Sequence, residues 1–237
     1  MRPVLSRTGT DRSPGTLQAV MFDMDGLLVD TEPLWFEVEC SVMARLGGQW
    51  TAADQVALIG GSMDRSVVYL IERAGRPAEP DQVANWLRYG MAELLEARGV
   101  EPMPGAVELV GQVRAAGLPY ALVTSSEPII VDAVLATLAR RDVSFEVIVS
   151  GADVTKPKPA PEPYLLATAK LGVDPEYCVA LEDSQNGVRS ARAAGCVTVA
   201  VPGHAPIADV TGVHVVTSLA ELNLDLLRGL VSAAAPS

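Results

Sequence analysis

The first strand-like segment of the chain reads Ala19-Val-Met-Phe-Asp23-Met-Asp25-Gly26, four apolar residues that lead into two aspartates. A short, continuous apolar run is typical of a strand buried on both faces of a parallel sheet. Comparable runs recur downstream at 120–124, 146–150, 178–182, 197–201 and 213–216. Helical patterns separate them at 105–116, 127–139, 161–171 and 185–194. This alternation predicts a Rossmann-like α/β fold, in which helices cover both faces of a mostly parallel sheet.

The region between the first two strand-like runs departs from this alternation. It holds helical patterns at 34–46, 51–58, 64–74 and 81–98, with no strand-like run between them. Glycine pairs such as Gly60-Gly61 mark the breaks between these helices. We therefore expect an all-helical cap at 33–103, inserted into a core made of 18–32 and 104–237. Its two short tethers suit hinges that close the cap over the sheet.

The composition limits the classes of protein that fit. Of 237 residues, 49% are hydrophobic, so the chain can bury a core. The net charge of -11 argues against nucleic-acid binding, which depends on basic residues that contact phosphates. No apolar run reaches the roughly 20 residues of a membrane span. The three cysteines form no CxxC pair, which disfavours zinc-ribbon and redox sites.

These observations predict a soluble, cytoplasmic protein that binds neither nucleic acid nor a membrane. We expect residues 1–17 to form a flexible extension, because they combine arginines and prolines with several serines and threonines. The oligomeric state stays open.

Polar side chains follow the strand-like runs where a parallel sheet binds its ligands, beyond the carboxyl ends of the strands. These residues are Asp23, Asp25, Thr124, Lys158, Glu182 and Asp183. Carboxylates and a backbone carbonyl are the hard oxygen ligands that Mg²⁺ prefers. An ammonium group beside the metal neutralises the charge of a phosphate, so the set predicts Mg²⁺-assisted phosphoryl transfer.

Each group has a chemical role in such a reaction. Asp23 is placed to attack phosphorus and form an aspartyl-phosphate. Asp25 is placed to protonate the leaving oxygen and later to take a proton from water, provided that its pKa is raised. Thr124 and nearby backbone N–H groups would bind the nonbridging oxygens. Each residue also has a simpler interpretation, since aspartates after strands are common turn residues.

The segment Asp23-Met-Asp25-Gly-Leu-Leu-Val-Asp-Thr-Glu-Pro-Leu-Trp35 resembles the first motif of the haloacid dehalogenase superfamily, in its β-phosphoglucomutase-like phosphatase branch. Three further motifs follow in the family's order. They are Val123-Thr-Ser-Ser126, Lys158-Pro-Ala-Pro-Glu162 and Leu181-Glu-Asp-Ser-Gln-Asn-Gly187. The resemblance spans about residues 19–216, and the ordered set of four is far more specific than any one motif.

This resemblance implies roles for individual residues. Asp23 is then the nucleophile and a Mg²⁺ ligand, and Asp25 is the acid/base that also lends its backbone carbonyl to the metal. Thr124 and Lys158 hold the phosphoryl group, and Ser125 is a candidate for binding it. Glu182 and Asp183 complete the metal site, and of the two we expect Asp183 to bind the metal directly. The helical cap selects the substrate.

Departures from the family pattern favour one kind of member. Haloacid dehalogenases lack the second aspartate, so Asp25 favours phosphate chemistry. Phosphonoacetaldehyde hydrolases use a cap lysine, and residues 33–103 contain none. β-Phosphoglucomutases carry a histidine where this chain has Trp35. We therefore expect a phosphatase acting on a small phosphate ester such as a sugar phosphate.

Three cap residues are candidates for substrate contact, namely Trp35, Ser62 and Arg65. Trp35 also suits a packing role in the cap, and Arg65 suits a solvated surface. Two other functions stay open. A sugar phosphomutase would require activation by a bisphosphate and give an isomer without net phosphate release, whereas a non-catalytic binder of Mg²⁺ and phosphate would release none.

Overall fold

The computed structural model describes residues 15–209 and 211–234. Most of the extension expected at 1–17 lies outside the described residues. Its last residue, Leu17, is buried and belongs to the hydrophobic core. The neighbouring Gln18 donates its backbone N–H to the Tyr177 carbonyl oxygen at 2.8 Å, so the chain is already anchored to the core here.

Six parallel strands form the central sheet, in the order β3-β2-β1-β4-β5-β6. Their bounds are β1 (Ala19–Phe22), β2 (Tyr120–Val123), β3 (Val147–Val149), β4 (Cys178–Glu182), β5 (Val197–Ala200) and β6 (His214–Val215). The order reverses between β1 and β4, and the carboxyl ends of strands at such a reversal are where α/β sheets bind ligands. The expected Rossmann-like parallel sheet is confirmed.

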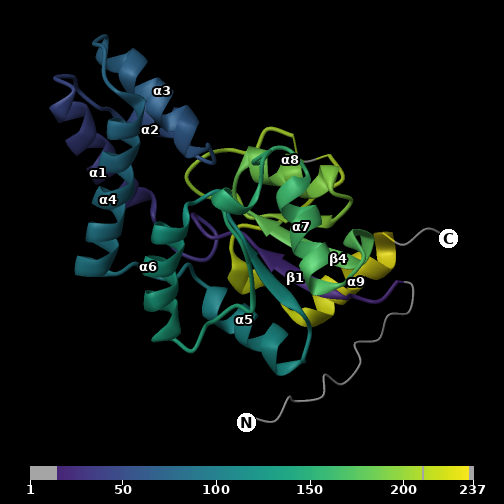
Figure 1. Cartoon of the computed structure of the whole chain (residues 1–237). Coiled ribbons are helices and arrows are strands. Elements are labelled where there is room, and N and C mark those ends of the chain that lie inside the picture. The colour runs from purple at the N-terminus through teal and green to yellow at the C-terminus, as the bar shows by residue number, and fades with distance from the viewer. Residues whose placement is uncertain (1–14, 210, 235–237) are drawn as a thin grey trace.

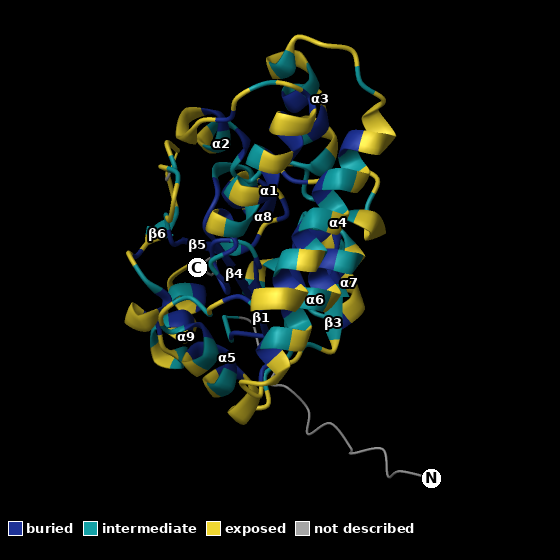
Figure 2. Cartoon of the chain, turned by 90° about the vertical axis from the view of Figure 1, so that its left-hand side faces the viewer, coloured by how far each residue is buried: buried dark blue, intermediate teal, exposed yellow. Residues whose placement is uncertain are grey.

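Alternate residues of the strands face two separate layers of helices. Val20, Phe22 and Leu181 belong to one hydrophobic cluster, and Met21 and Ala180 to another. The first layer contains α5 (Ala106–Ala115), α6 (Pro128–Ala139) and α9 (Leu224–Ala234), and the second contains α7 (Glu162–Leu171) and α8 (Gln185–Ala193). The central strands β1 and β4 are therefore buried on both sides (Figure 2), as their continuous apolar runs require.

After β1 the chain forms four consecutive helices before it returns to the core through α5 and β2, with no regular strand among the four in the structure. They are α1 (Glu32–Arg45), α2 (Ala52–Leu58), α3 (Met63–Ala74) and α4 (Pro80–Arg98). Figure 1 shows this helical insertion beside the sheet, with α4 packed against α6 of the core. Within 15–209 and 211–234, none of the helices combines the length and the apolar character that crossing a bilayer requires.

Candidate active site

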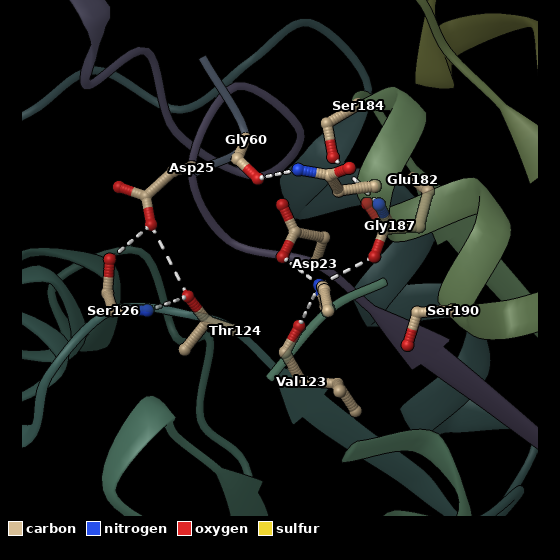
Figure 3. A network of polar contacts seen from close by, with 12 residues as sticks. Asp23, Asp25, Gly60, Val123, Thr124, Ser126, Glu182, Ser184, Gly187 and Ser190 are labelled. Carbon is tan, nitrogen blue, oxygen red and sulfur yellow. Dashed lines mark hydrogen bonds and ion pairs between the residues drawn. The ribbon is translucent and has the colours of Figure 1, made fainter. Parts of the chain in front are cut away.

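Acidic side chains and one lysine gather at the carboxyl ends of β1 and β4. The parallel register pairs Phe22 with Leu122 on one side and with Leu181 on the other. Asp23, the next residue, therefore lies between the ends of β2 and β4 (Figure 3). Asp23 and Lys158 are 135 residues apart in the sequence. The parallel pairing of the strands brings the predicted side chains together.

Lys158 is the electrostatic centre of this cluster. Its Nζ donates to Asp23 Oδ1 and to Glu182 Oε1, both at 2.6 Å, and to the Val123 carbonyl oxygen at 2.9 Å. These three bonds use all three protons of the ammonium group. The lysine side chain is only 4% exposed, so its direction is fixed by its partners and not by solvent.

Burial and charge compete at this ion pair. Burial raises the pKa of Asp23 to about 7; the Lys158 ammonium lowers it, whereas the Glu182 and Asp25 carboxylates raise it. Burial alone would lower the pKa of Lys158, but the Asp23 and Glu182 carboxylates raise it above its ordinary value. Lys158 thus stays charged, and its hydrogen bond to Asp23 Oδ1 fixes the Asp23 carboxylate at the strand end.

Glu182 is fully buried and has partners for only one oxygen. Its Oε1 accepts from Lys158 and from the Tyr164 hydroxyl. Its Oε2 has no hydrogen-bond partner among the described residues. Gly187 leaves room for this carboxylate, because a Cβ there would lie 1.8 Å from Oε2. The glycine of the last motif therefore makes space for a charged group inside the fold.

Asp23, Glu182 and Asp183 form a cluster with the donor set of a cation site. Each offers a carboxylate oxygen, and these atoms lie within 4.8 Å of one another. One ammonium group faces three carboxylates, which leaves excess negative charge. Burial, with the Asp23 and Glu182 carboxylates, raises the pKa of Asp183 well above its ordinary value. The hard oxygen donors and the partnerless Glu182 Oε2 fit a small divalent cation such as Mg²⁺.

Gly26 lets Asp183 approach the first motif. The glycine has a φ of +78°, and a Cβ at this position would lie 2.1 Å from Asp183 Oδ2. Both the left-handed backbone and the missing side chain are therefore needed. The Asp-x-Asp-Gly sequence thus supplies the Asp23 carboxylate, and its glycine leaves the space that the Asp183 carboxylate occupies.

The Asp25 side chain accepts hydrogen bonds from three hydroxyl groups, and Figure 3 shows it directed toward two of them, on Thr124 and Ser126, and away from Asp23. Its Oδ1 accepts from Thr31 at 2.7 Å, and its Oδ2 accepts from Ser126 at 2.7 Å and from Thr124 at 3.3 Å. Thr31 and Ser126 were not identified from the sequence, although both lie inside the motifs. These hydroxyls fix the orientation of Asp25 beside the cavity.

A cavity of about 100 Å³ joins this cluster to the helical insertion. Trp35, Ser62 and Ser125, three of the predicted substrate-binding residues, line it. Arg65 does not; its guanidinium donates to the Ala57 carbonyl oxygen at 2.7 Å, and its role in substrate binding stays a prediction. The insertion therefore contributes directly to the wall of the site.

Glu32 and Glu39 also line the cavity, and sequence reasoning did not single them out. Together with Trp35 they occupy positions i, i+3 and i+7 of α1, which share one helix face. That spacing was the available signal. Without the structure, nothing indicated that this face of α1 looks into the site and not into the core of the insertion.

The insertion contacts the core at both sides of the cavity. Asn186 Nδ2 donates to the Gly60 carbonyl oxygen at 2.9 Å. On the other side, Arg88 of α4 forms an ion pair with Glu127 at the start of α6, in which Nη2 lies 2.7 Å from Oε1. These two contacts hold the insertion against the core, next to the carboxyl ends of the strands.

The sequence pattern of the haloacid dehalogenase-like hydrolases matches residues 20–201. The chain belongs to this family. Hexitol phosphatase B of Escherichia coli strain K12 is 35% identical over 193 residues, which cover 80% of this chain and 86% of the relative. The predicted superfamily is confirmed.

Solved structures of the family share the fold. A variant of CbbY from Rhodobacter sphaeroides, in complex with xylulose-(1,5)bisphosphate, aligns with a TM-score of 0.80 and 29% identity. The alignment covers 89% of this chain and 99% of CbbY. β-Phosphoglucomutase from Clostridium difficile gives a TM-score of 0.78 at 20% identity, over 92% of this chain and 98% of the mutase, and shows the fold alone. This haloacid dehalogenase-like chain is an enzyme, a hydrolase of phosphoric monoesters in the β-phosphoglucomutase-like branch.

Proposed function

We propose that this chain is a Mg²⁺-dependent phosphatase that hydrolyses a small phosphate monoester, such as a sugar phosphate, through an aspartyl-phosphate on Asp23. One observation carries the proposal. Asp23 is buried at a strand end with one oxygen held by Lys158, next to two further carboxylates that leave excess negative charge. The name of hexitol phosphatase B adds support for a phosphorylated polyol or sugar.

The metal would be held by the carboxylates of Asp23 and Asp183 and by the backbone carbonyl of Asp25, with Glu182 completing the site. When bound, Mg²⁺ neutralises charge on the phosphoryl oxygens and so lets an anionic nucleophile approach. Glu182 would also orient Lys158, because the same ammonium group donates to Glu182 and to Asp23. Thr124, Ser125 and Lys158 would hold the phosphoryl group.

The covalent steps involve two aspartates. An Asp23 oxygen forms a bond to phosphorus while the ester P–O bond breaks, and Asp25 gives its proton to the departing oxygen. Water then attacks the phosphoenzyme, Asp25 takes a proton from it, and the bond between phosphorus and Asp23 breaks to release phosphate. The three hydroxyls around Asp25 would aim its carboxyl group in both steps.

The helical insertion would act as a cap over the active site. The cap would consist of residues 33–103, and the core of residues 18–32 and 104–237. Its contacts with the core support this role, since Gly60 and Arg88 reach residues on both sides of the cavity. Trp35 and Ser62 would then meet the substrate inside the cavity, and Arg65 would meet a part of the substrate that extends beyond the cavity lining. We also propose a cytoplasmic location, which the free thiols of all three cysteines support.

The test is a panel of phosphorylated metabolites, scored for free phosphate and for isomerised product. We expect phosphate release that EDTA stops and that added Mg²⁺ restores. Activity indifferent to the chelator would contradict the metal assignment. An isomer formed without net phosphate release, and only in the presence of a bisphosphate, would favour a sugar phosphomutase instead.

A further inference from the structure

The wall that α1 presents to the cavity is acidic. Glu32 and Glu39 are both buried, with 8% and 4% of their surfaces exposed, and both line the cavity. Trp35 lies between them on the same helix face, and Leu58 and Met63 add apolar surface from α2 and α3. A ligand in this part of the cavity would meet two carboxyl groups and a mainly hydrocarbon surface.

Each of these carboxyl groups is held by one donor and keeps one oxygen available. Gln55 Nε2 donates to Glu32 Oε2 at 3.0 Å, and Trp50 Nε1 donates to Glu39 Oε2 at 2.9 Å. The described residues provide no hydrogen-bond partner for the Oε1 atom of either glutamate, and neither atom is sealed in the protein interior. The two groups are therefore oriented in advance, with hydrogen-bonding capacity left for a ligand.

The cavity offers no counter-charge for a second anion. Lys158 is the one cation among the described residues that line it, and it lies at the strand ends, where it pairs with Asp23 and Glu182 and would hold the transferred phosphoryl group. Arg65 lies outside the cavity lining, and Arg88 is paired with Glu127. A carboxylate or a second phosphate at the α1 end would lose its hydration without gaining an ion pair.

The acidic groups also repel one another. Burial raises the pKa of Glu32 to about 7, and the Asp25 carboxylate adds to the rise. Burial likewise raises the pKa of Glu39 to about 8, and the Glu32 carboxylate adds to it. Near neutral pH each group therefore shares its charge with a bound proton, and an anion placed beside either group would raise the pKa of that group further.

We propose that Glu32 and Glu39 select a phosphate ester whose leaving group is an uncharged polyol, and that they reject leaving groups carrying a carboxylate or a second phosphate. Hydroxyl groups of the polyol would donate to the available carboxyl oxygens, and its C–H surface would lie along Trp35. The proposal rests on the phosphatase function above and names its substrate class. It separates this chain from the CbbY variant, which is in complex with a bisphosphate.

The experiment compares matched esters on the intact enzyme with Mg²⁺. D-Glucitol 6-phosphate is set against 6-phosphogluconate, and fructose 6-phosphate against fructose 1,6-bisphosphate, with p-nitrophenyl phosphate as a substrate lacking hydroxyl groups. The charged member of each pair loses its hydration without gaining an ion pair, and it meets like charge wherever Glu32 or Glu39 is ionised. We therefore expect kcat/KM to favour the uncharged member of each pair by about 100-fold. Equal or reversed preference, with p-nitrophenyl phosphate still hydrolysed, would overturn the selectivity proposal alone.

Failure of the phosphatase function has a different signature, since no ester of the panel would then release phosphate. The variants Glu32→Gln and Glu39→Gln keep the shape of the side chain and remove its ability to ionise. We expect each to narrow the preference within the pairs by about tenfold, the effect of one hydrogen bond to a charged group. Glu37→Gln is the matched control, because Glu37 lies on α1, is half exposed and pairs with Arg98 outside the cavity. A preference equally altered by Glu37→Gln would contradict a local role of the two buried glutamates.

Discussion

The two ends of the cavity differ in how firmly their polar groups are held. At the core end, Lys158 uses all of its protons and Asp25 accepts from three hydroxyls, while Glu182 Oε2 has no partner in the described part of the chain, as a cation site requires. At the insertion end, Glu32 and Glu39 each have one donor and one available oxygen. The core end is thus preorganised for one set of atoms, which suits chemistry common to many substrates. At the insertion end, half of the carboxyl oxygens of Glu32 and Glu39 have no donor among the residues that the structure describes. They stay available for the part of a substrate that differs from one substrate to another.

Asp23→Asn tests the core end most severely. The amide keeps the shape of the side chain but is a very poor nucleophile, so we expect kcat to fall by at least about 10⁴-fold. Phosphate release on the preferred ester measures this. The melting temperature of the variant serves as a control for folding. Near-normal release would mean that the reaction does not pass through Asp23.

Asp25→Asn should cost less, because it removes proton transfer and leaves the nucleophile in place. General acid–base catalysis contributes about 10²- to 10⁴-fold, and we expect a loss in that range on a sugar phosphate. The first step with p-nitrophenyl phosphate should suffer far less, since nitrophenolate leaves without a proton. A burst of nitrophenolate in rapid mixing measures that step. Equal losses on both substrates would assign Asp25 a structural role.

Much of the core end could be predicted from the sequence, because its residues directly follow apolar runs that form strands. Asp23, Thr124 and Glu182 lie where the strand pattern puts them, and the parallel pairing explains their proximity. What the sequence did not reveal is the choice of partners. Tyr164 donates to Glu182, and Ser126 donates to Asp25, through packing between elements distant in the chain.

The insertion end was harder to predict for a physical reason. Its residues lie on helices, and a helix face can look into a cavity, a core or solvent depending on how whole helices pack. Glu39 illustrates this difficulty, since it was overlooked although it lines the cavity. Arg65 was singled out but lies outside the lining, and its role in substrate binding stays a prediction. The helix α9 was also not expected, although it buries Leu227 and Val231 against the sheet.

Gly60→Ala tests how the two ends are joined. Gly60 has a φ of +67°, and a Cβ there would lie 2.6 Å from the Ser184 Cβ of the core. The loop would have to move away, and misplacement by about an ångström costs up to about 10²-fold, so we expect kcat/KM on a sugar phosphate to fall by about 10- to 100-fold. Gly75→Ala is the matched control, with a φ of +65° but no atom within 4 Å of the added Cβ. Similar losses in both variants would show that backbone strain, and not the contact with Ser184, causes the effect.

Glu39→Gln tests the insertion end through stability and should have the smallest effect. Burial raises the pKa of Glu39 from its ordinary 4.5 to about 8, so the folded state keeps the proton that the unfolded chain releases. The wild type therefore loses stability as the pH rises from about 4.5 to about 8, whereas glutamine does not titrate. We expect the variant to gain on the order of 1–2 kcal/mol relative to wild type between pH 5 and pH 6.5, measured by urea unfolding at both values. Glu37→Gln should show no such gain, because its Arg98 partner lowers the pKa of Glu37. A difference between Glu39→Gln and wild type that does not change with pH would mean that Glu39 is ionised in the folded protein, and that the α1 wall carries its full negative charge even without a ligand.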